Sequence, residues 1–230
     1  MGFFTGDIHG SPLRITRFAE KFSLTSNDTI VILGDVGANY FLTERDEEMK
    51  AHLNMVKPTI LCIHGNHEIR PSNIPTYYLT GWSGGKVWID DKFPNIKFAK
   101  DGEIYNIEGL RYIAIGGAYS VDKHYRLAKG YGWWEDEQPS DEIKEFVKKQ
   151  ITEKDIDVVL SHTCPFRFRP LEVFMSSIDQ STVDTSTEEW LDDIEDNLNY
   201  KAWLCGHWHT NKRIDKMYFL FEGWATTDDI

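Results

Sequence analysis

The sequence predicts an α/β fold in which two β-sheets pack face to face and helices flank them. Short apolar runs alternate with amphipathic runs over the first part of the chain, as in a sheet covered by helices. From about residue 95, strand-like runs follow one another across tight turns, which indicates a second sheet. With 230 residues and a hydrophobic fraction of 41%, the chain is large enough to bury the core that this fold needs.

The N-terminal part follows the order strand, helix, strand, helix, strand. It comprises strand-like runs at 2–7, 28–35 and 57–66 and helical runs at 11–24 and 43–56. The second strand-like run is continuously apolar, as in a strand that is buried on both faces. Thr43 with Asp46 three residues later resembles a helix start. This order is typical of a layered sheet with covering helices.

The pattern changes over residues 95–117. The turn dipeptides Asp101-Gly102 and Glu108-Gly109 separate strand-like runs there, which predicts a second sheet rich in antiparallel pairs. Further along lie helical runs at 139–151 and 186–198, strand-like runs at 157–162 and 202–207, and terminal strands over 212–223. Since no repeat, low-complexity tract or linker interrupts the chain, we expect one domain that spans residues 1–230.

Charge and composition exclude several kinds of partner. A net charge of −12 argues against long nucleic acids, because their phosphates require a basic surface. No apolar run approaches the roughly 20 residues of a membrane helix, and the N-terminus lacks a signal-peptide pattern, so we expect no membrane partner. The three cysteines have no CxxC spacing, which favours free thiols over a disulfide. We therefore expect a cytoplasmic protein.

Polar residues follow five of the strand-like runs, at the point where each strand meets a loop. The segments are TGDIHG, LGDVG, HGNHE, LSHT and CGHWHT. Because ligand sites in layered α/β sheets form at the carboxyl ends of strands, we expect these segments to meet at one edge. The candidate site residues are Asp7, His9, Asp35, Asn66, His67, His162, His207 and His209.

Each of these residues also has an ordinary structural explanation. A histidine can belong to the core, an asparagine to a turn, and an aspartate to a helix N-cap. Five of the eight histidines are nevertheless among these candidate residues, which favours a shared site. Of the other three, His52 and His124 are expected on the surface, and His64 is expected to be structural.

The motifs GDIHG, GDVG, GNHE, SH and GHWH, in this order, resemble those of the metallophosphoesterase (calcineurin-like phosphoesterase) superfamily. They run from residue 6 to residue 209, which is nearly the whole chain. The resemblance implies the metallophosphatase-like four-layer fold, a two-sheet β-sandwich flanked by helices, in agreement with the periodicity. It also implies an enzyme that hydrolyses phosphomonoesters or phosphodiesters with the help of metal ions.

The resemblance implies a role for each candidate residue. Asp7, His9 and His209 would hold one metal ion, while Asn66, His162 and His207 would hold a second, and Asp35 would bridge both. Two such ions clamp a phosphate and activate a hydroxide for attack on phosphorus. His67 would act as the general acid toward the leaving oxygen. Imidazole, carboxylate and amide ligands suit manganese, iron or zinc, and the sequence does not decide between them.

One stretch departs from the protein Ser/Thr phosphatases of this superfamily. Their GDxxDRG motif carries an arginine that holds the phosphate, whereas Asn39 stands at that position here. The sequence offers four possible substitutes, Arg70, Arg126, Arg167 and Arg169, each of which has a plain surface charge as its alternative. We favour Arg70 or Arg126. The departure makes a phosphoprotein phosphatase the alternative prediction.

Two long irregular segments, 117–139 and 163–186, follow strands that end near the predicted site and are expected to form the walls of a substrate pocket. Aromatic side chains of the first segment either stack on a ring of the substrate or pack the segment onto the fold; they are Tyr119, Tyr125, Tyr131, Trp133 and Trp134. We predict a di-metal hydrolase of small phosphoesters, including nucleotides. A non-catalytic scaffold is the third hypothesis, and it would leave a complete site unused.

Overall fold

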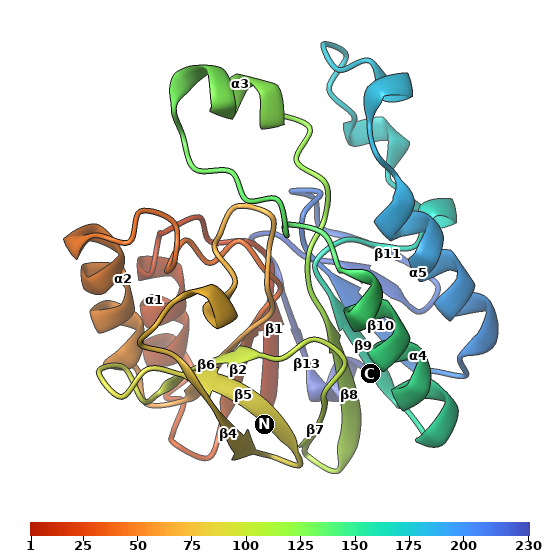
Figure 1. The fold of residues 1–230 in the computed structure, drawn as a ribbon. Helices are drawn as coiled ribbons and strands as arrows, with labels where there is room; N and C mark the ends of the chain where they lie inside the picture. The colour runs from red at the N-terminus through yellow and green to blue at the C-terminus, as the bar shows by residue number, and fades with distance from the viewer.

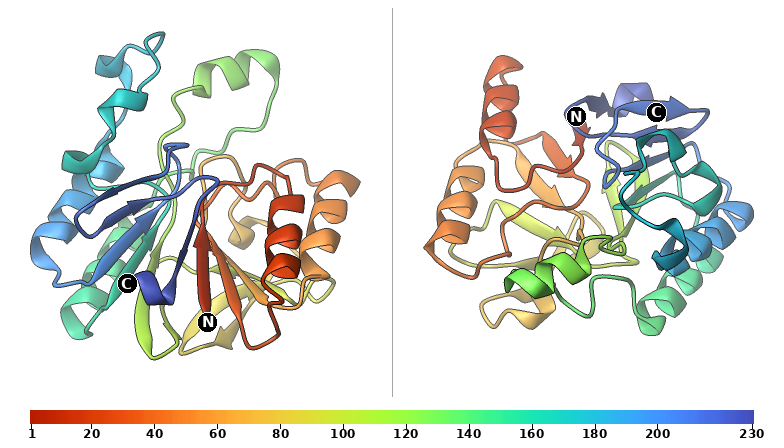
Figure 2. Two further views of the ribbon diagram at one scale, coloured as in Figure 1. Left: turned by 180° about the vertical axis from the view of Figure 1, so that it is seen from behind. Right: turned by 90° about the horizontal axis from the view of Figure 1, so that it is seen from above.

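The computed structural model describes residues 1–230 and contains two β-sheets packed face to face, with helices on their outer faces (Figure 1; Figure 2). The first sheet has seven strands in the order β13-β1-β2-β3-β6-β5-β4. The second has six strands in the order β11-β12-β10-β9-β8-β7. The α/β two-sheet fold expected from the sequence is therefore confirmed.

The first sheet is parallel at its centre and antiparallel at its edges. Its strands are β1 (Gly2–Thr5), β2 (Thr29–Ile32), β3 (Thr59–Cys62), β4 (Tyr78–Trp82), β5 (Gly85–Ile89), β6 (Ile96–Ala99) and β13 (Trp224–Thr226). β1, β2, β3 and β6 are parallel, while β13, β5 and β4 pair antiparallel. All residues of β1 and β2 are buried, which explains their continuously apolar sequence.

The second sheet is mostly parallel, so the expectation of antiparallel pairs is wrong. Its strands are β7 (Ile104–Ile107), β8 (Leu110–Ile115), β9 (Val158–Ser161), β10 (Ala202–Cys205), β11 (Lys212–Ile214) and β12 (Met217–Phe219). Only the edge pairs β7-β8 and β11-β12 are antiparallel. The connections from β8 to β9 and from β9 to β10 contain helices, and a helical crossover allows a parallel return.

Residues 78–99 also differ from the sequence prediction, which began the second sheet at about residue 95. β6 pairs parallel with β3 and belongs to the first sheet. The hairpin β4-β5 before it was not expected. Its turn residues Ser83 and Gly84 both have positive φ, 49° and 93°, as in the tight turns that join antiparallel strands. β4 is exposed along much of its length, so its sequence lacks the apolar run of a buried strand.

Five α-helices and five short 3₁₀ turns complete the fold. The α-helices are α1 (Leu13–Lys21), α2 (Glu44–Asn54), α3 (Lys123–Lys129), α4 (Asp141–Glu153) and α5 (Ser186–Asn197). The 3₁₀ turns are η1 (Pro71–Asn73), η2 (Phe166–Phe168), η3 (Leu171–Val173), η4 (Gln180–Thr182) and η5 (Thr227–Asp229). None of these helices is long and apolar enough to cross a lipid bilayer. α1 and α2 cover the first sheet, and α4 and α5 cover the second (Figure 1).

α2 begins within the predicted helical segment, but the side chain of Thr43 does not form the hydrogen bond expected at its start. Thr43 is the N-cap residue, yet its side chain makes no capping hydrogen bond. Asp46 instead turns back and accepts the backbone N–H groups of Phe41 and Leu42 through Oδ2, each at 2.8 Å. This bond ties the loop after β2 to the helix, and the same loop carries Asp35 at its start.

The core consists of three apolar layers. One lies between the first sheet and α1 and α2, one between the two sheets, and one between the second sheet and α4 and α5. Phe4 of β1 stacks on Tyr112 of β8 in the middle layer, with ring centroids 5.5 Å apart, and both are fully buried. Removing a buried phenylalanine typically costs about 3–5 kcal/mol, so contacts of this kind hold the two sheets in a fixed relation.

This packing brings the carboxyl ends of five strands to the same edge of the molecule. β1, β2 and β3 end there from the first sheet, and β9 and β10 end there from the second (Figure 1). The irregular segments 117–139 and 163–186 rise from this edge, and the unpredicted helix α3 lies in the first of them (Figure 1; Figure 2).

Candidate metal centre

The five polar segments meet where these strands end. Asp7 and His9 follow β1, and Asp35 follows β2. Asn66 and His67 follow β3. From the second sheet, His162 follows β9, while His207 and His209 follow β10. The contacts among them form two groups.

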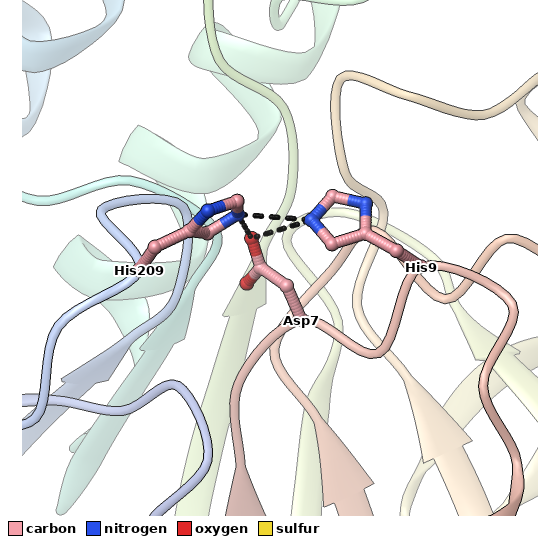
Figure 3. A group of neighbouring side chains, drawn as sticks. All are labelled: Asp7, His9 and His209. Atoms are coloured by element: carbon pink, nitrogen blue, oxygen red, sulfur yellow. Dashed lines mark hydrogen bonds and ion pairs between the residues drawn. The ribbon is translucent and has the colours of Figure 1, made fainter. Parts of the chain in front are cut away.

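The first group consists of Asp7, His9 and His209, and it contains atoms from both sheets (Figure 3). Nε2 of His209 lies 3.2 Å from Oδ2 of Asp7, and Nε2 of His9 lies 3.8 Å from the same oxygen. The two Nε2 atoms are 2.9 Å apart. Oδ2 of Asp7 is buried and makes no hydrogen bond, which is costly for a carboxylate oxygen unless a cation binds it. The group therefore fits one metal ion.

The second group surrounds the side chain of Asn66. Its Oδ1 lies 2.8 Å from Nε2 of His162 and 3.1 Å from Nδ1 of His207. Oδ1 of Asp35 lies 3.6 Å from Nε2 of His162. Asp7, Asp35 and His162 also form a cluster whose candidate ligand atoms all lie within 4.8 Å of one another. Asp7 thus belongs to both clusters, and the predicted bridging by Asp35 stays a prediction.

Hydrogen bonds behind these residues fix their orientation. Nδ1 of His162 lies 2.8 Å from the carbonyl oxygen of Leu33, so a proton on Nδ1 leaves Nε2 free to bind a cation. Oδ1 of Asp7 accepts the backbone N–H of His207 at 2.9 Å. The guanidinium of Arg14, which the sequence did not single out, donates to the carbonyl oxygens of Gly6 and Asp7, each at 2.9 Å. Such second contacts set the direction in which a ligand atom points.

Four candidate ligands occupy the left-handed region of backbone conformation. The φ angles are 44° for His9, 45° for Asp35, 65° for His207 and 48° for His209. This region is uncommon for residues other than glycine and clusters at functional sites, where the surrounding structure maintains it. The backbone is thus bent at the positions from which these side chains reach the site.

Two glycines allow the close approach of the loops. A Cβ atom at Gly65 would lie 2.0 Å from Oδ1 of Asp35, and one at Gly206 would lie 2.3 Å from Oδ1 of Asp7. Neither contact is possible, so both positions require glycine. The glycines of GNHE and GHWH therefore make room for the carboxylates of the neighbouring strands.

The protein environment lowers the pKa of two candidate ligands and raises that of a third. Burial alone would raise the pKa of Asp7, but the imidazoles of His209 and His162 and the N–H of His207 lower it to about 2. Burial lowers the pKa of His207 to about 3. The contact with Asp7 raises the pKa of His209. Asp7 and His207 therefore hold the protonation states that metal binding requires, whereas His209 holds its proton more tightly than usual.

His67 lies beside the metal-ligand groups, and its side chain is 30% exposed. Its backbone N–H donates to Oδ1 of Asp35 at 2.8 Å, while its ring meets that of His9 edge to face at 5.8 Å. Nε2 lies 3.9 Å from Oδ1 of Asp122. Burial lowers the pKa of His67, and the carboxylates of Asp35 and Asp122 oppose that shift. The ring therefore faces the site from its rim.

Glu68 is a buried group of the site that the sequence motifs did not single out. Its Oε1 accepts the N–H of Gly65 at 3.0 Å, while Oε2 is buried without a partner. Burial and the charge of Asp35 raise the pKa of Glu68 to about 8. Its place in GNHE, directly after His67, was the sequence signal that could have drawn attention to it.

The candidate arginines Arg70 and Arg126 differ in how many of their guanidinium N–H groups have partners. Arg70 forms an ion pair with Asp101 and donates through Nε to the carbonyl oxygen of Asp136 at 2.7 Å. Arg126 is 2% exposed and donates to the carbonyl oxygen of Gly132 and to Oγ of Ser120, but its Nη2 has no partner.

The other two candidate arginines and Asn39 make contacts outside the two groups of candidate ligands. Arg167 forms ion pairs with acidic residues of α5, and the guanidinium of Arg169 lies 3.4 Å over the ring of Phe166. Asn39 is fully buried and accepts a hydrogen bond from the hydroxyl of Tyr77 at 3.0 Å. The side chain of Asn39 therefore bonds to a residue of the apolar layer between the first sheet and the helices α1 and α2.

The aromatic side chains of segment 117–139 divide into two sets. Tyr125 and Tyr131 are exposed and meet edge to face, with centroids 6.2 Å apart. Trp134 packs against Tyr40 at 5.3 Å, and Lys123 lies 3.9 Å over the ring of Trp133. The two tyrosines are therefore accessible to a ligand, while the tryptophans hold the segment in place.

Two groups of side chains that could hold metal ions lie at the edge of a two-sheet α/β fold, an arrangement that suits a metal-dependent hydrolase. The sequence model of the calcineurin-like phosphoesterases matches residues 3–211. The chain therefore belongs to the calcineurin-like phosphoesterase family, and it is a metal-dependent phosphoric ester hydrolase.

Two solved structures resemble the fold. The phosphopantetheinyl hydrolase PptH from Mycobacterium tuberculosis superimposes with a TM-score of 0.53 at 15% identity, over 96% of this chain and 87% of that one. The protein TT1561 of Thermus thermophilus superimposes with a TM-score of 0.52 at 12% identity, over the same shares. A comparison with curated proteins found no match. At these identities the likeness supports the fold alone.

We expect the ion held by Asp7, His9 and His209 to be lost first as the pH falls. The raised pKa of His209 means that a proton competes for its nitrogen at a pH where histidine is ordinarily neutral. The pKa of His207, at about 3, excludes such competition near neutrality. Mn²⁺ titrations by calorimetry from about pH 8 to about pH 6 should show one binding step weaken before the other. Equal weakening of both steps would contradict this expectation.

Proposed function

We propose that the protein hydrolyses phosphomonoesters or phosphodiesters of small molecules, including nucleotides, at a centre of two metal ions. The observation that carries this proposal is the buried Oδ2 of Asp7, which has no hydrogen-bond partner and faces His9 and His209. A second group of ligand atoms lies beside it. Because the family acts on phosphoesters, a binuclear centre at this edge supports the same chemistry here.

The proposed ligands are shared between two ions. Asp7, His9 and His209 would hold one ion, Asn66, His162 and His207 would hold the other, and Asp35 would be shared by both. When bound, the ions supply positive charge for the phosphate and lower the pKa of a water molecule toward about 7. The donors are imidazole, carboxylate and amide, which suit manganese or iron, with zinc as a further candidate.

His67 is the proposed general acid. Its ring stands at the rim of the centre, and its backbone is fixed by the bond to Asp35. An anionic phosphoester raises the pKa of an adjacent histidine, as the nearby carboxylate of Asp122 already does in part. His67 can then give its proton to the leaving oxygen.

Arg126 is proposed to bind the phosphate together with the metal ions, and Arg70 is the other candidate for this role. The unpartnered Nη2 of Arg126 supports the first choice, since a buried guanidinium with a free N–H favours an anion. Arg70 is paired with the buried carboxylate of Asp101, whereas the carboxylate nearest to Arg126 is that of the partly exposed Asp122, 3.7 Å from Nη1. The lack of the protein-phosphatase arginine, whose position Asn39 occupies, favours small esters over phosphoproteins.

The setting of the proposed activity follows from composition. We place the protein in the cytoplasm, because all three cysteines are free and buried, as is usual for proteins of a reducing compartment. The net charge of −12 disfavours long nucleic acids as substrates. The proposed ligands are spread from residue 7 to residue 209, which supports one catalytic domain over residues 1–230. We propose no membrane partner, since no helix is long and apolar enough to cross a bilayer.

The substrate class is tested by a panel assayed with Mn²⁺. We expect higher kcat/KM for p-nitrophenyl phosphate, bis-p-nitrophenyl phosphate and nucleotides than for a phosphoserine peptide. A phosphopantetheinyl ester belongs in the panel because of the name of one structural neighbour. A chelator should abolish activity and Mn²⁺ should restore it, whereas Asp35→Asn should lose both metal and activity. Faster turnover of the phosphopeptide would favour the alternative, a phosphoprotein phosphatase, and no turnover of any ester would favour a scaffold.

His67→Ala should keep two metal ions per chain and lose turnover, because general acid catalysis is worth about 10²–10⁴-fold. The loss should be large for phenyl phosphate and smaller for p-nitrophenyl phosphate, whose leaving group needs little protonation. His124→Ala, a substitution of an exposed histidine, is the matched control. An equal loss with both substrates would remove the role of general acid from His67.

Arg126→Ala should lower kcat/KM by about 10- to 150-fold, the equivalent of about 1.5–3 kcal/mol for a hydrogen bond to a charged group. Added guanidinium should restore part of the activity, which a merely structural role would not allow. Arg70→Ala should lower the melting temperature, since it leaves Asp101 buried without its partner, and should change kcat/KM little. The reverse pattern would assign the phosphate to Arg70.

A further inference from the structure

We infer that Ser120 and Glu137 are positioning residues that fix which end of the Asn66 amide faces the metal centre. Nδ2 of Asn66 donates to Oγ of Ser120 at 2.9 Å, and Oγ of Ser120 donates to Oε2 of Glu137 at 2.5 Å. These two residues lie outside the predicted ligand set, and neither touches a candidate ion site directly. The inference rests on the proposed role of Asn66 as a ligand.

The polarity of the hydrogen bonds carries the argument. A carboxylate only accepts, so the single hydroxyl proton of Ser120 is committed to Glu137. The two lone pairs of that hydroxyl then accept from Nδ2 of Asn66 and from Nη1 of Arg126, at 2.9 Å and 3.0 Å. Ser120 has no proton left for Asn66, and the amide must present its nitrogen to Ser120. Its oxygen therefore faces His162 and His207.

Burial makes this preference strong. Ser120, Glu137 and Asn66 are each at most 2% exposed, so water does not offer an alternative partner. The second oxygen of Glu137 accepts the backbone N–H of Ser120 at 3.0 Å, which holds the carboxylate in one orientation. An inverted amide would turn its N–H₂ toward the candidate cation and its oxygen toward the hydroxyl of Ser120, whose proton is committed to Glu137. Both changes are unfavourable.

The same bond also closes the base of segment 117–139. Ser120 lies just after β8, and Glu137 lies just before α4, so the two ends of the segment meet beside Asn66. α3, which contains Tyr125, extends from this junction (Figure 1). Segment 117–139 is thereby tied to a candidate ligand of one ion, but not to those of the other.

The test measures the affinity of each ion rather than activity alone. In Mn²⁺ titrations by calorimetry, Ser120→Ala should weaken one of two binding steps by about 10- to 100-fold, the usual effect of losing a residue that orients a ligand. The step assigned to Asp7, His9 and His209 should not change. Glu137→Gln should have the same effect, because its new amide nitrogen donates to Ser120 and reverses the polarity without a change in shape.

Two controls separate positioning from general loosening. Thr187→Ala removes another buried hydroxyl that holds this segment, through a 2.7 Å bond to Gln138, but it does not contact a candidate ligand. It should leave both Mn²⁺ steps unchanged. In an Asn66→Asp background, Ser120→Ala should have little effect on the affinity, because a carboxylate presents an oxygen in either orientation.

The possible results differ for the two proposals. Two unchanged steps in both Ser120→Ala and Glu137→Gln would overturn the positioning role and leave the proposed function intact. Equal weakening of both steps, or an equal effect of Thr187→Ala, would also overturn it. A wild-type protein that binds fewer than two Mn²⁺ ions would instead refute the binuclear centre itself.

Discussion

The contact between the inner faces of the two sheets determines the position of every candidate ligand. Asp7, His9, Asp35 and Asn66 come from the first sheet, while His162, His207 and His209 come from the second. Neither sheet carries a complete set. The middle apolar layer, with Phe4 stacked on Tyr112, fixes the distance between the two contributions. The candidate metal centre is thus formed at the interface between the sheets, and the close packing of that interface fixes its geometry.

The loops add a second level of control at shorter range. Left-handed φ angles at four candidate ligands and the absent Cβ atoms at Gly65 and Gly206 allow the five loops to approach one another closely. The carboxylate of Asp7 accepts the N–H of His207 and thereby joins the loops after β1 and β10, while that of Asp35 accepts the N–H of His67 and joins the loops after β2 and β3. The N–H of His9 donates to the carbonyl oxygen of Asp35 at 2.8 Å and links the two pairs of loops. Unfavourable backbone conformations persist there because neighbouring strands supply several contacts to each bend.

Much of this arrangement could be predicted from the sequence, because the chemistry is concentrated at strand ends. The GDIHG and GHWH segments each break an apolar run with polar residues, and a pattern of that kind is visible locally. The parallel pairing of β8, β9 and β10 in the second sheet could not be predicted, since these pairs join residues far apart in the chain. Ser120 was missed for a similar reason, as it lies in an aperiodic segment 54 residues from Asn66. The role of Arg14 depends on a contact with backbone oxygens, which no side-chain motif records.

The pairing of β13 with β1 has a consequence for the synthesis of the chain. β1 carries the first candidate ligands and gains its antiparallel neighbour only when Trp224–Thr226 is present, and the N–H of Gly2 bonds to Oγ1 of Thr227. Until then, one side of β1 presents free N–H and C=O groups, the kind of edge to which strands of other chains add. A chain in which residues 224–227 are not yet made or are removed therefore exposes an unpaired strand edge, which β13 covers in the folded protein.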